Sequence, residues 1–572
     1  MLKVSMRAFR ATDAAPRRRP FAALAVGAAS GALIALSLPP FGWWPLGWLG
    51  LALIVWSLPS ATVARRVAIG AGWGLAQYGI GIAWTVQFSG YGFAVLLVVC
   101  AVYTCLSTVV VPTRANWNVA VGFPVAVMLA EWARDRFPLH GFPLAALALG
   151  QAAGPLEWSV RIGGGLLLSG ETALVGVVVA FGAKAVWQRL PAESAERLRR
   201  RLLQLPLRVG RPGRNGDRGR GSEVLALPGL ALTAALCVAV PAVGWLSPSG
   251  AGEKLGALSV ALVQGGGPLG TRAIHTNPQV VFDRQLSESM SLRGPVELVV
   301  WPEGMLQANR AFQTGVDASR VAALARRLSA TVIVGIVQNL GPAHYLNEVA
   351  AWSPKGQVVA TYVKNHLVPF GEYIPARGFL SRYFNLADVP RDAIPGHGPA
   401  FMTTPAAPLG VLISYEVFFG ARARSGVLAG GEVLVVPADD ASYRGTQVVG
   451  QELAAARLRA VETGRWLVLV SPTGYSEVVR PDGVVEHRTP LSLPAVVQAT
   501  VGLRNGRTWF VDLGDKPFVA AAALLWVVAA IGGDSAVRRL ALRRLRRLAC
   551  ADGRDREANL LRDRTQAEAE TR

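Results

Sequence analysis

Apolar segments of similar length recur through the first half of the chain and once more near its end. They lie at residues 21–38, 41–58, 67–88, 92–112, 117–133, 164–187, 224–246 and 517–533. A helix of about 20 apolar residues is long enough to cross a bilayer. The pattern therefore predicts a multi-pass α-helical membrane protein with about eight spans. The first segment follows a basic stretch, as in a secretory signal peptide, but its length and the Pro39-Pro40 pair that ends it favour a retained helix.

A different pattern begins at Leu255, where short apolar runs alternate with polar connections. This alternation is typical of an α/β domain. The predicted strands are residues 257–263, 297–301, 331–337, 347–353, 357–363, 410–414, 432–437, 466–471 and 496–501. The predicted helices are residues 315–329 and 447–462. About 250 residues are enough to bury a core of their own.

These patterns divide the chain into four parts. They are a transmembrane region of seven spans (1–254), an α/β domain (255–505), a linker with the last span (506–534) and a basic tail (535–572). Within the first part, the sequence HGFPLAALALG at 140–150 is apolar but too short to span. A re-entrant or interfacial segment and a buried loop between helices fit it about equally well.

Composition and charge support the membrane interpretation. The chain is 52% apolar and only 17% charged, and its mean hydropathy is +0.35. Its formal net charge is +21, but the basic residues gather beside apolar segments, at the N-terminus, in the loop 188–222 and in the tail. That distribution follows the positive-inside rule and does not indicate a nucleic-acid surface. We therefore expect the basic loop and tail in the cytoplasm, and residues 247–516 on the extracytoplasmic side.

Charged and hydroxyl side chains follow three of the predicted strands. Glu303 comes after the strand ELVVW, and Ser414 ends the strand GVLIS. Between them, the segment TYVKNHLVPFGEYIP holds Lys364 and Glu372 in apolar surroundings, where such residues are rarely buried without partners. Side chains at the carboxyl ends of strands point into the crevice where α/β domains hold ligands. These residues are candidates for a general base, an amine and a nucleophile; a structural ion pair and a helix-capping serine are the alternatives.

Metal and thiol chemistry are not indicated for this domain. The four cysteines lie in apolar segments or in the tail, at positions 100, 105, 237 and 550. The α/β domain therefore has no cysteine nucleophile, no disulfide and no thiolate metal site. His366 and His397 show no ligand spacing, so we expect no metal.

Five motifs carry a resemblance to a known family. They are ALVQGG (261–266), WPEG (301–304), YVKNHLVPFGEYIP (362–375), SYE (414–416) and ARLRAVETGR (456–465). The α/β domain resembles the carbon-nitrogen hydrolase (nitrilase) superfamily, whose triad is glutamate, lysine and cysteine on an α-β-β-α sandwich. With eight spans around one such domain, the whole chain resembles the bacterial apolipoprotein N-acyltransferase family. The lysine motif is the most specific part of the match.

The resemblance implies transfer of a fatty acyl chain from a membrane phospholipid to the diacylglyceryl-cysteine amine of an apolipoprotein. It implies a bacterial inner-membrane enzyme with its catalytic domain outside the cytoplasm, and no metal or organic cofactor. The implied site residues are Glu303, Lys364, Glu372, Ser414, Tyr415 and Glu416. In this scheme Ser414 attacks the ester and Glu303 accepts its proton. Lys364 and the Tyr415 backbone amide hold the oxyanion, Glu372 orients Lys364, and Glu416 supports the site.

The chain departs from the family at two positions. Ser414 stands where the family has its nucleophilic cysteine, and Ser442 in PADDASYRG stands where tryptophan is expected. A hydroxyl is less acidic than a thiol, and an amine attacks an oxyester less readily than a thioester, so both half-reactions should be slower. Two alternatives remain: a membrane-anchored amidase or esterase, and a catalytically silent protein that binds lipoproteins or a partner enzyme. The charged residues that are kept in an apolar pocket favour catalysis.

Overall fold

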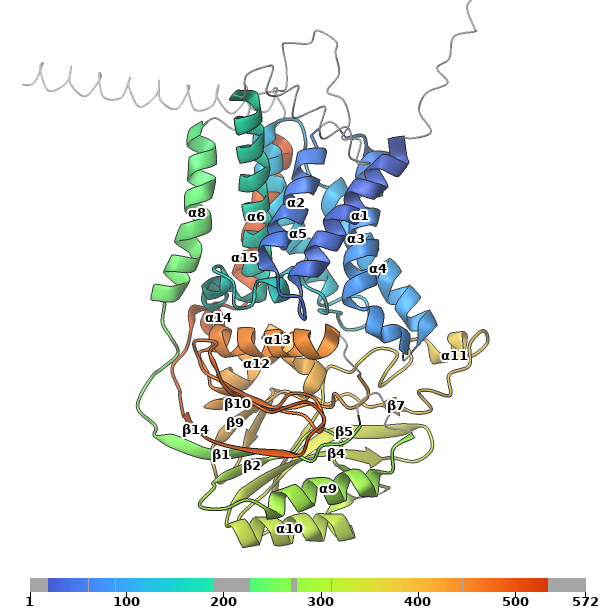
Figure 1. Ribbon diagram of the computed structural model, residues 1–572, viewed down its shortest axis with the longest axis vertical. Helices are drawn as coiled ribbons and strands as arrows, with labels where there is room; N and C mark the ends of the chain where they lie inside the picture. The colour runs from blue at the N-terminus through green and yellow to red at the C-terminus, as the bar shows by residue number, and fades with distance from the viewer. Residues whose placement is uncertain are drawn as a thin grey trace, which may run out of the picture.

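The computed structural model describes residues 19–59, 61–87, 89–189, 227–268, 275–309, 311–443 and 447–532. The predicted basic tail, and the basic loop from residue 190 onward, lie outside the described residues. A layer of helices stands on an α/β sandwich, and the two parts are stacked along the long axis of the molecule (Figure 1).

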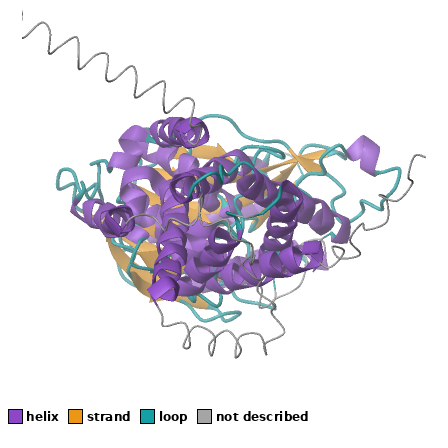
Figure 2. Cartoon of the chain, turned by 90° about the horizontal axis from the view of Figure 1, so that it is seen from above, coloured by secondary structure: helices purple, strands orange, loops and turns teal. Residues whose placement is uncertain are grey.

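Each of the eight apolar segments forms a helix. The helices are α1 (Arg19–Ser37), α2 (Trp44–Ser57), α3 (Val63–Gly81), α4 (Gly90–Val109), α5 (Asn116–Arg134), α6 (Val160–Arg189), α8 (Leu227–Leu246) and α15 (Lys516–Gly532). Helix α3 packs between α1 and α4, α2 packs on α6, and α15 packs on α5. Seen from the end of the bundle, these helices cover much of the sandwich (Figure 2).

Length and apolarity support a membrane region. Among the described residues, three helices are long and apolar enough to cross a bilayer: Gly90–Val109, Glu157–Arg189 and Pro228–Leu246. Three shorter apolar helices accompany them: Phe21–Ser37, Trp44–Ser57 and Lys516–Ile531. The remaining two, α3 and α5, carry charged residues near one end. The membrane class is therefore supported, whereas the number of eight crossings stays a prediction.

Glycines allow α1 and α3 to approach closely. A Cβ atom on Gly27 would lie 2.1 Å from the Ile69 carbonyl oxygen, and one on Gly72 would lie 2.2 Å from that of Leu24. Any larger residue would push the two backbones apart. Such small-residue contacts are typical of helices packed within a membrane.

The segment at 140–150 is a buried connection between the two layers. It contains only the short helix η2 (Leu147–Gln151), and the side chains of Phe142 and Leu144 are buried. The Ala145 carbonyl accepts a hydrogen bond from Gln77 Nε2 (2.8 Å), and its amide donates to Gln451 Oε1 (2.9 Å). These contacts match the buried-loop interpretation; its depth relative to the membrane stays a prediction.

The sandwich consists of two sheets covered by helices on both outer faces. The first has the order β14-β1-β2-β4-β5-β6, with β3 (Leu306–Ala308) on β4 and β7 (Asp392–Ala393) on β5. The six strands in this order are β14 (Ala495–Gly502), β1 (Ala257–Gln264), β2 (Leu298–Val300), β4 (Thr331–Asn339), β5 (His344–Trp352) and β6 (Val358–Val363). Helices α9 (Pro278–Met290) and α10 (Val316–Leu328) pack on its outer face (Figure 1).

The second sheet has the order β13-β12-β11-β10-β9-β8. Its strands are β13 (Val485–Arg488), β12 (Glu477–Val479), β11 (Leu467–Val470), β10 (Val433–Pro437), β9 (Pro408–Val411) and β8 (Phe401–Thr403). Helices α12 (Gly420–Leu428) and α13 (Gln447–Thr463) cover it. The α-β-β-α architecture and all nine predicted strands are confirmed, and the short strands β3, β7, β8, β12 and β13 were not predicted.

Helix α13 joins the sandwich to the helical layer. Gln451 donates to the Gly81 carbonyl at the end of α3 (2.8 Å), and Arg457 forms an ion pair with Glu157 (2.7 Å). Glu462 accepts a hydrogen bond from the Gly165 amide in α6 (3.1 Å). The helix therefore has a fixed position beneath the bundle (Figure 1).

Candidate active site

Lys364 lies at the centre of a buried cluster of polar side chains. It directly follows β6 and is only 1% exposed. Its Nζ donates to Glu303 Oε1 (2.8 Å) and to Glu372 Oε1 (3.0 Å). The amide of Asn347, from β5, donates to the same two oxygens (2.5 and 2.6 Å). We call these four residues the lysine cluster.

The charges of the lysine cluster depend on one another. Burial alone would lower the pKa of Lys364, but the nearby Glu303 and Glu372 carboxylates outweigh this effect and raise it above its usual value. Burial raises the pKa of Glu372, with Glu303 adding to the shift, and Lys364 opposes it. Glu372 Oε2 also accepts the Val368 amide (2.7 Å). Lys364 is therefore a charged donor held in place, as an oxyanion requires.

Ser414 stands in a strained turn. The prediction placed it at the end of a strand, but β9 ends at Val411, three residues earlier. Its φ of 44° lies in the left-handed region, which residues other than glycine seldom occupy. The short helix η6 (Ser414–Phe418) begins there, because the Glu416 carboxylate accepts the Ile413 amide (3.0 Å) and turns the chain. Strain of this kind, about 1–3 kcal/mol, is common at functional sites.

Glu416 ties the serine turn to the lysine segment. It is fully buried, and its Oε1 accepts hydrogen bonds from the Tyr362 hydroxyl (2.8 Å) and the Asn365 amide (2.9 Å). Arg422 lies 3.5 Å from the same oxygen. The Tyr415 side chain is also buried, with its hydroxyl bonded to the Gly141 carbonyl (3.3 Å). These contacts indicate that Glu416 supports the site. The backbone amide of Tyr415 stays the candidate oxyanion donor.

Three polar residues at this site were not predicted from sequence: Asn347, Asp440 and Glu452. Helix α13, which carries Glu452, packs against η6, which begins at Ser414. Asp440 follows β10, and a Cβ atom on Gly474 would lie 2.3 Å from its Oδ2 and 2.7 Å from Ser471 Oγ, so these two side chains are neighbours. Glu452 lies just before the motif ARLRAVETGR. We call Ser414, Glu452, Asp440 and Ser471 the serine cluster.

Burial raises the pKa values of both carboxyl groups in the serine cluster. The charge of Asp440 raises the pKa of Glu452 further. The pKa of Asp440 rises to about 6, with the neighbouring Glu452 and Ser471 opposing the effect of burial. Neither carboxyl group therefore ionises as readily as it would in water.

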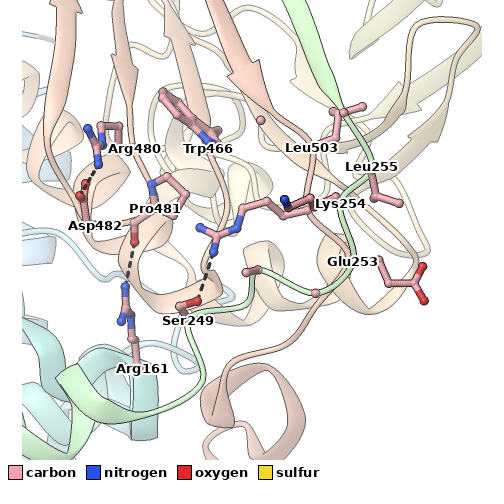
Figure 3. Close-up of a pocket in the computed structure, with 15 residues that line it drawn as sticks. Arg161, Ser249, Glu253, Lys254, Leu255, Trp466, Arg480, Pro481, Asp482 and Leu503 are labelled. Atoms are coloured by element: carbon pink, nitrogen blue, oxygen red, sulfur yellow. Dashed lines mark hydrogen bonds and ion pairs between the residues drawn. The ribbon is translucent and has the colours of Figure 1, made fainter.

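A cavity of about 590 Å³ opens at the opposite end of the sandwich, where β1 and β11 begin (Figure 3). It is lined partly by Arg161, which donates to the Pro481 carbonyl (3.3 Å), and by Arg504, which donates to Ser249 (3.2 Å). The predicted catalytic residues are not part of its lining. This cavity is therefore separate from the lysine and serine clusters.

Three arginines of the α/β domain have structural partners within the chain. Arg422 donates to the Gly398 carbonyl and to Tyr362, and Arg424 donates to the carbonyls of residues 510 and 512. Arg465 is 1% exposed and donates to backbone carbonyls, including that of Gly431 (2.9 Å). Their geometry favours a role in holding loops together.

The α-β-β-α sandwich carries a glutamate, a lysine and a serine hydroxyl beyond its strand ends, and it is joined to apolar helices. These features define a membrane-associated protein of the carbon-nitrogen hydrolase class. The family described as carbon-nitrogen hydrolase matches residues 259–509. The family described as the apolipoprotein N-acyltransferase N-terminal domain matches residues 30–178.

Curated relatives match over most of the chain. The apolipoprotein N-acyltransferase of Mycolicibacterium smegmatis is 30% identical over 537 residues, which are 89% of this chain and 84% of the relative. That of Geobacter metallireducens is 29% identical, covering 91% of this chain and 96% of the relative. Among solved structures, a nitrilase-superfamily amidase from Nesterenkonia AN1 is 20% identical, covers 48% of this chain and 99% of that chain, and gives a TM-score of 0.34. The chain belongs to the apolipoprotein N-acyltransferase family.

Proposed function

We propose that this protein transfers a fatty acyl chain from a membrane phospholipid to the diacylglyceryl-cysteine amine of apolipoproteins, through an acyl-enzyme on Ser414. The observation that carries the proposal is the Lys364–Glu303 pair (2.8 Å) together with the bond from the Asn365 amide to Glu416 (2.9 Å), which ties the strained Ser414 turn to the lysine segment. The relatives that span most of the chain support the same substrates.

In the first half-reaction, Ser414 attacks the ester carbonyl of the phospholipid, and Glu303 accepts the serine proton and then gives it to the glycerol oxygen that leaves. The charged Lys364 and the Tyr415 backbone amide stabilise the oxyanion. Glu372 and Asn347 hold Lys364 and its partner Glu303 in place. The lysophospholipid leaves and an oxyester remains on Ser414.

In the second half-reaction, the lipoprotein amine attacks this oxyester. Glu303 is the general base of the family scheme, in which it accepts the proton of the incoming amine. Collapse of the second oxyanion forms the amide and frees Ser414. This ping-pong scheme uses residues of the chain alone.

A position at membrane level explains why such a domain carries apolar helices. The ends of α6 and α8 that flank the basic loop lie at the far end of the bundle from the sandwich (Figure 1). Arg66, at the start of α3, donates to the Val111 carbonyl just beyond the end of α4. If these basic ends are cytoplasmic, the sandwich lies on the extracytoplasmic side. We therefore propose eight crossings with the catalytic domain outside the inner membrane.

The two alternatives are less well supported. A silent scaffold has no physical need for Lys364, which is 1% exposed and held by two carboxylates. A membrane-anchored amidase or esterase would use the same clusters with water as the acceptor. Only the acceptor separates that reading from the proposed transfer.

The test is mass spectrometry of a diacylated model lipoprotein incubated with phospholipid and the purified full chain in detergent. We expect the lipoprotein to gain one acyl chain with the natural protein and none with Ser414→Ala. Ser414→Cys should react faster, because a thiol is more acidic and a thioester is a better acyl donor.

Each other result has a defined meaning. Release of free fatty acid without acylated lipoprotein would favour the hydrolase. Acyl gain only with Ser414→Cys would mean that serine does not support catalysis, and the binding interpretation would then lead.

A further inference from the structure

The cavity of Figure 3 lies where the helical layer meets the sandwich. On its helical side it is lined by Arg161, in the first turn of α6, and by Ser249, three residues after α8 ends at Leu246. Trp466 and Arg504 of the sandwich line its other side. Its volume of about 590 Å³ lies in the range of small-molecule sites. Because α6 and α8 are long and apolar enough to cross a bilayer, the cavity lies beside the ends of two candidate spans.

The lining of this cavity carries a net positive charge. Four basic residues and two acidic ones contribute to it: Arg161, Lys254, Arg480, Arg504, Glu253 and Asp482. The Asp482 carboxylate is paired with Arg480 (2.9 Å), as Figure 3 shows. A concave surface with charge of one sign attracts ligands of the opposite sign. The cavity is therefore suited to an anion.

Arg161 is buried at the helical wall with an unused donor. It is 6% exposed, lies over the Trp158 ring (4.5 Å to the ring centre), and points toward the sandwich, where it donates to the Pro481 carbonyl (3.3 Å). Its Nε is buried and has no hydrogen-bond partner among the described residues. A buried donor without an acceptor costs free energy. A ligand oxygen in the cavity would remove this cost.

Arg504 faces the same cavity with little compensation for its charge. It donates to the hydroxyl of Ser249 (3.2 Å), which is a neutral group. Burial lowers the pKa of Arg504, and the charge of Asp482 opposes this effect. Each guanidinium group carries five N–H donors in a planar fork that matches the oxygens of a phosphate. Together with Arg161, this residue could hold a phosphate group from two sides.

Exposed apolar side chains lie close to the cavity along the chain. Trp245 and Leu246, the last residues of α8, are 61% and 73% exposed. Tryptophan is common at the boundary between hydrocarbon and water in membrane proteins. A soluble phosphate compound would use the charged cavity alone. A phospholipid would use both features, with its phosphate in the cavity and its acyl chains along α8.

We propose that this cavity binds the phosphate group of an anionic phospholipid, with Arg161 and Arg504 as its ligands. The predicted catalytic residues do not line the cavity, so the bound lipid is not the acyl donor at Ser414. The inference therefore goes beyond the proposed function and does not depend on it. Since the two arginines belong to the helical layer and the sandwich, the lipid would also join these two parts of the molecule.

The experiment is native mass spectrometry of the full chain in detergent micelles with dioleoylphosphatidylglycerol or dioleoylphosphatidylcholine. The two lipids have the same acyl chains, but choline neutralises the phosphate charge of the second. We expect the natural protein to bind phosphatidylglycerol about 10-fold more tightly. Arg161→Gln and Arg504→Gln should each weaken this binding about 10-fold or more, because each removes charge-assisted hydrogen bonds to phosphate. Arg504→Lys should weaken it less, because lysine keeps the charge and loses the planar fork.

Arg507→Gln is the matched control. It makes the same change three residues from Arg504, at an arginine that lies outside the cavity lining and 3.6 Å from Asp512. Its binding of phosphatidylglycerol should equal that of the natural protein. The lipid should also raise the unfolding temperature of the natural protein and of Arg507→Gln, but not that of Arg504→Gln. Arg504 is only partly buried, so this comparison holds even if Arg161→Gln does not fold.

Three results would each overturn the lipid site. They are equal binding of the two lipids, unchanged binding of phosphatidylglycerol by Arg504→Gln, and its displacement by an equal concentration of soluble glycerol 3-phosphate. None of these measurements involves acyl transfer. A negative result here therefore leaves the role of Ser414 untouched, and a failure of the acyl-transfer test leaves the lipid site standing.

Discussion

The lysine cluster and the serine cluster lie in one site but differ in how the charge of their buried groups is compensated. Lys364 places a fixed positive charge between two carboxylates, and each contact is a short, direct hydrogen bond. Glu452 and Asp440 are instead two buried carboxyl groups, and burial raises the pKa of both. The paired charges of the lysine cluster oppose a change of protonation, whereas the carboxyl groups of the serine cluster can change protonation more easily. We therefore expect the lysine cluster to govern stability and oxyanion binding, and the serine cluster to govern the pH dependence of acylation.

The largest effect should come from Lys364→Met, which breaks the lysine cluster. It leaves Glu303 and Glu372 buried without their cation, and removing one partner of a buried ion pair typically costs about 3–5 kcal/mol. We expect a lower unfolding temperature in detergent and complete loss of acyl transfer. Lys355→Met, at an exposed position, should change neither quantity. A stable Lys364→Met variant would show that the cluster does not hold the fold.

A smaller effect is expected from Gly474→Ala, which disturbs the serine cluster alone. The new methyl group would lie 2.3 Å from Asp440 Oδ2 and 2.7 Å from Ser471 Oγ, so the carboxyl group must move. We expect the free energy of unfolding to fall by about 1–3 kcal/mol, as for other overpacked sites, and acylation by a long-chain p-nitrophenyl ester to be about 10-fold slower. Gly378→Ala, with open space around it, is the matched control. Unchanged acylation would mean that the position of Asp440 is unimportant.

The smallest effect should be a pH dependence that separates the two clusters. Burial raises the pKa of Asp440 to about 6, so this group gains its negative charge above that pH. If that charge assists removal of the serine proton, the rate of acylation by a p-nitrophenyl ester should be constant above this pH and fall as pH decreases through it, by up to about tenfold per unit. Glu303, Glu452 and Ser471 act on the same carboxyl group. Asp440→Asn should abolish the step, and a step that persists in this variant would place the titration elsewhere.

Much of the fold could be predicted from local patterns. Apolar runs of near-bilayer length became helices, and short apolar runs became strands, because each pattern reflects how a single element buries its own side chains. The strand that precedes Ser414 was predicted too long, because the Glu416 carboxylate takes the Ile413 amide and ends the extended backbone. The short strands such as β3 and β7 depend on pairing partners, and no local pattern marks them.

Part of the candidate site could also be predicted from local sequence patterns. Glu303, Lys364 and Glu372 are charges in apolar surroundings, which is visible in the sequence itself, and the structure brings them together. Asn347 lies inside a predicted strand, where nothing distinguishes a residue that faces a site from one that faces the core. Glu452 lies on a predicted helix, where a carboxylate is more often a solvated surface residue than a buried one.

The sequence by itself determined the membrane class, the α/β domain and the charged residues that end its strands, since burial patterns and unusual charges are properties of neighbouring positions. The tertiary structure alone decided that α13 crosses beneath the helical layer and packs against η6, which begins at Ser414. Contacts between elements distant in sequence depend on how sheets and helices pack as whole bodies. The surroundings of the candidate nucleophile could therefore be found only from the folded chain.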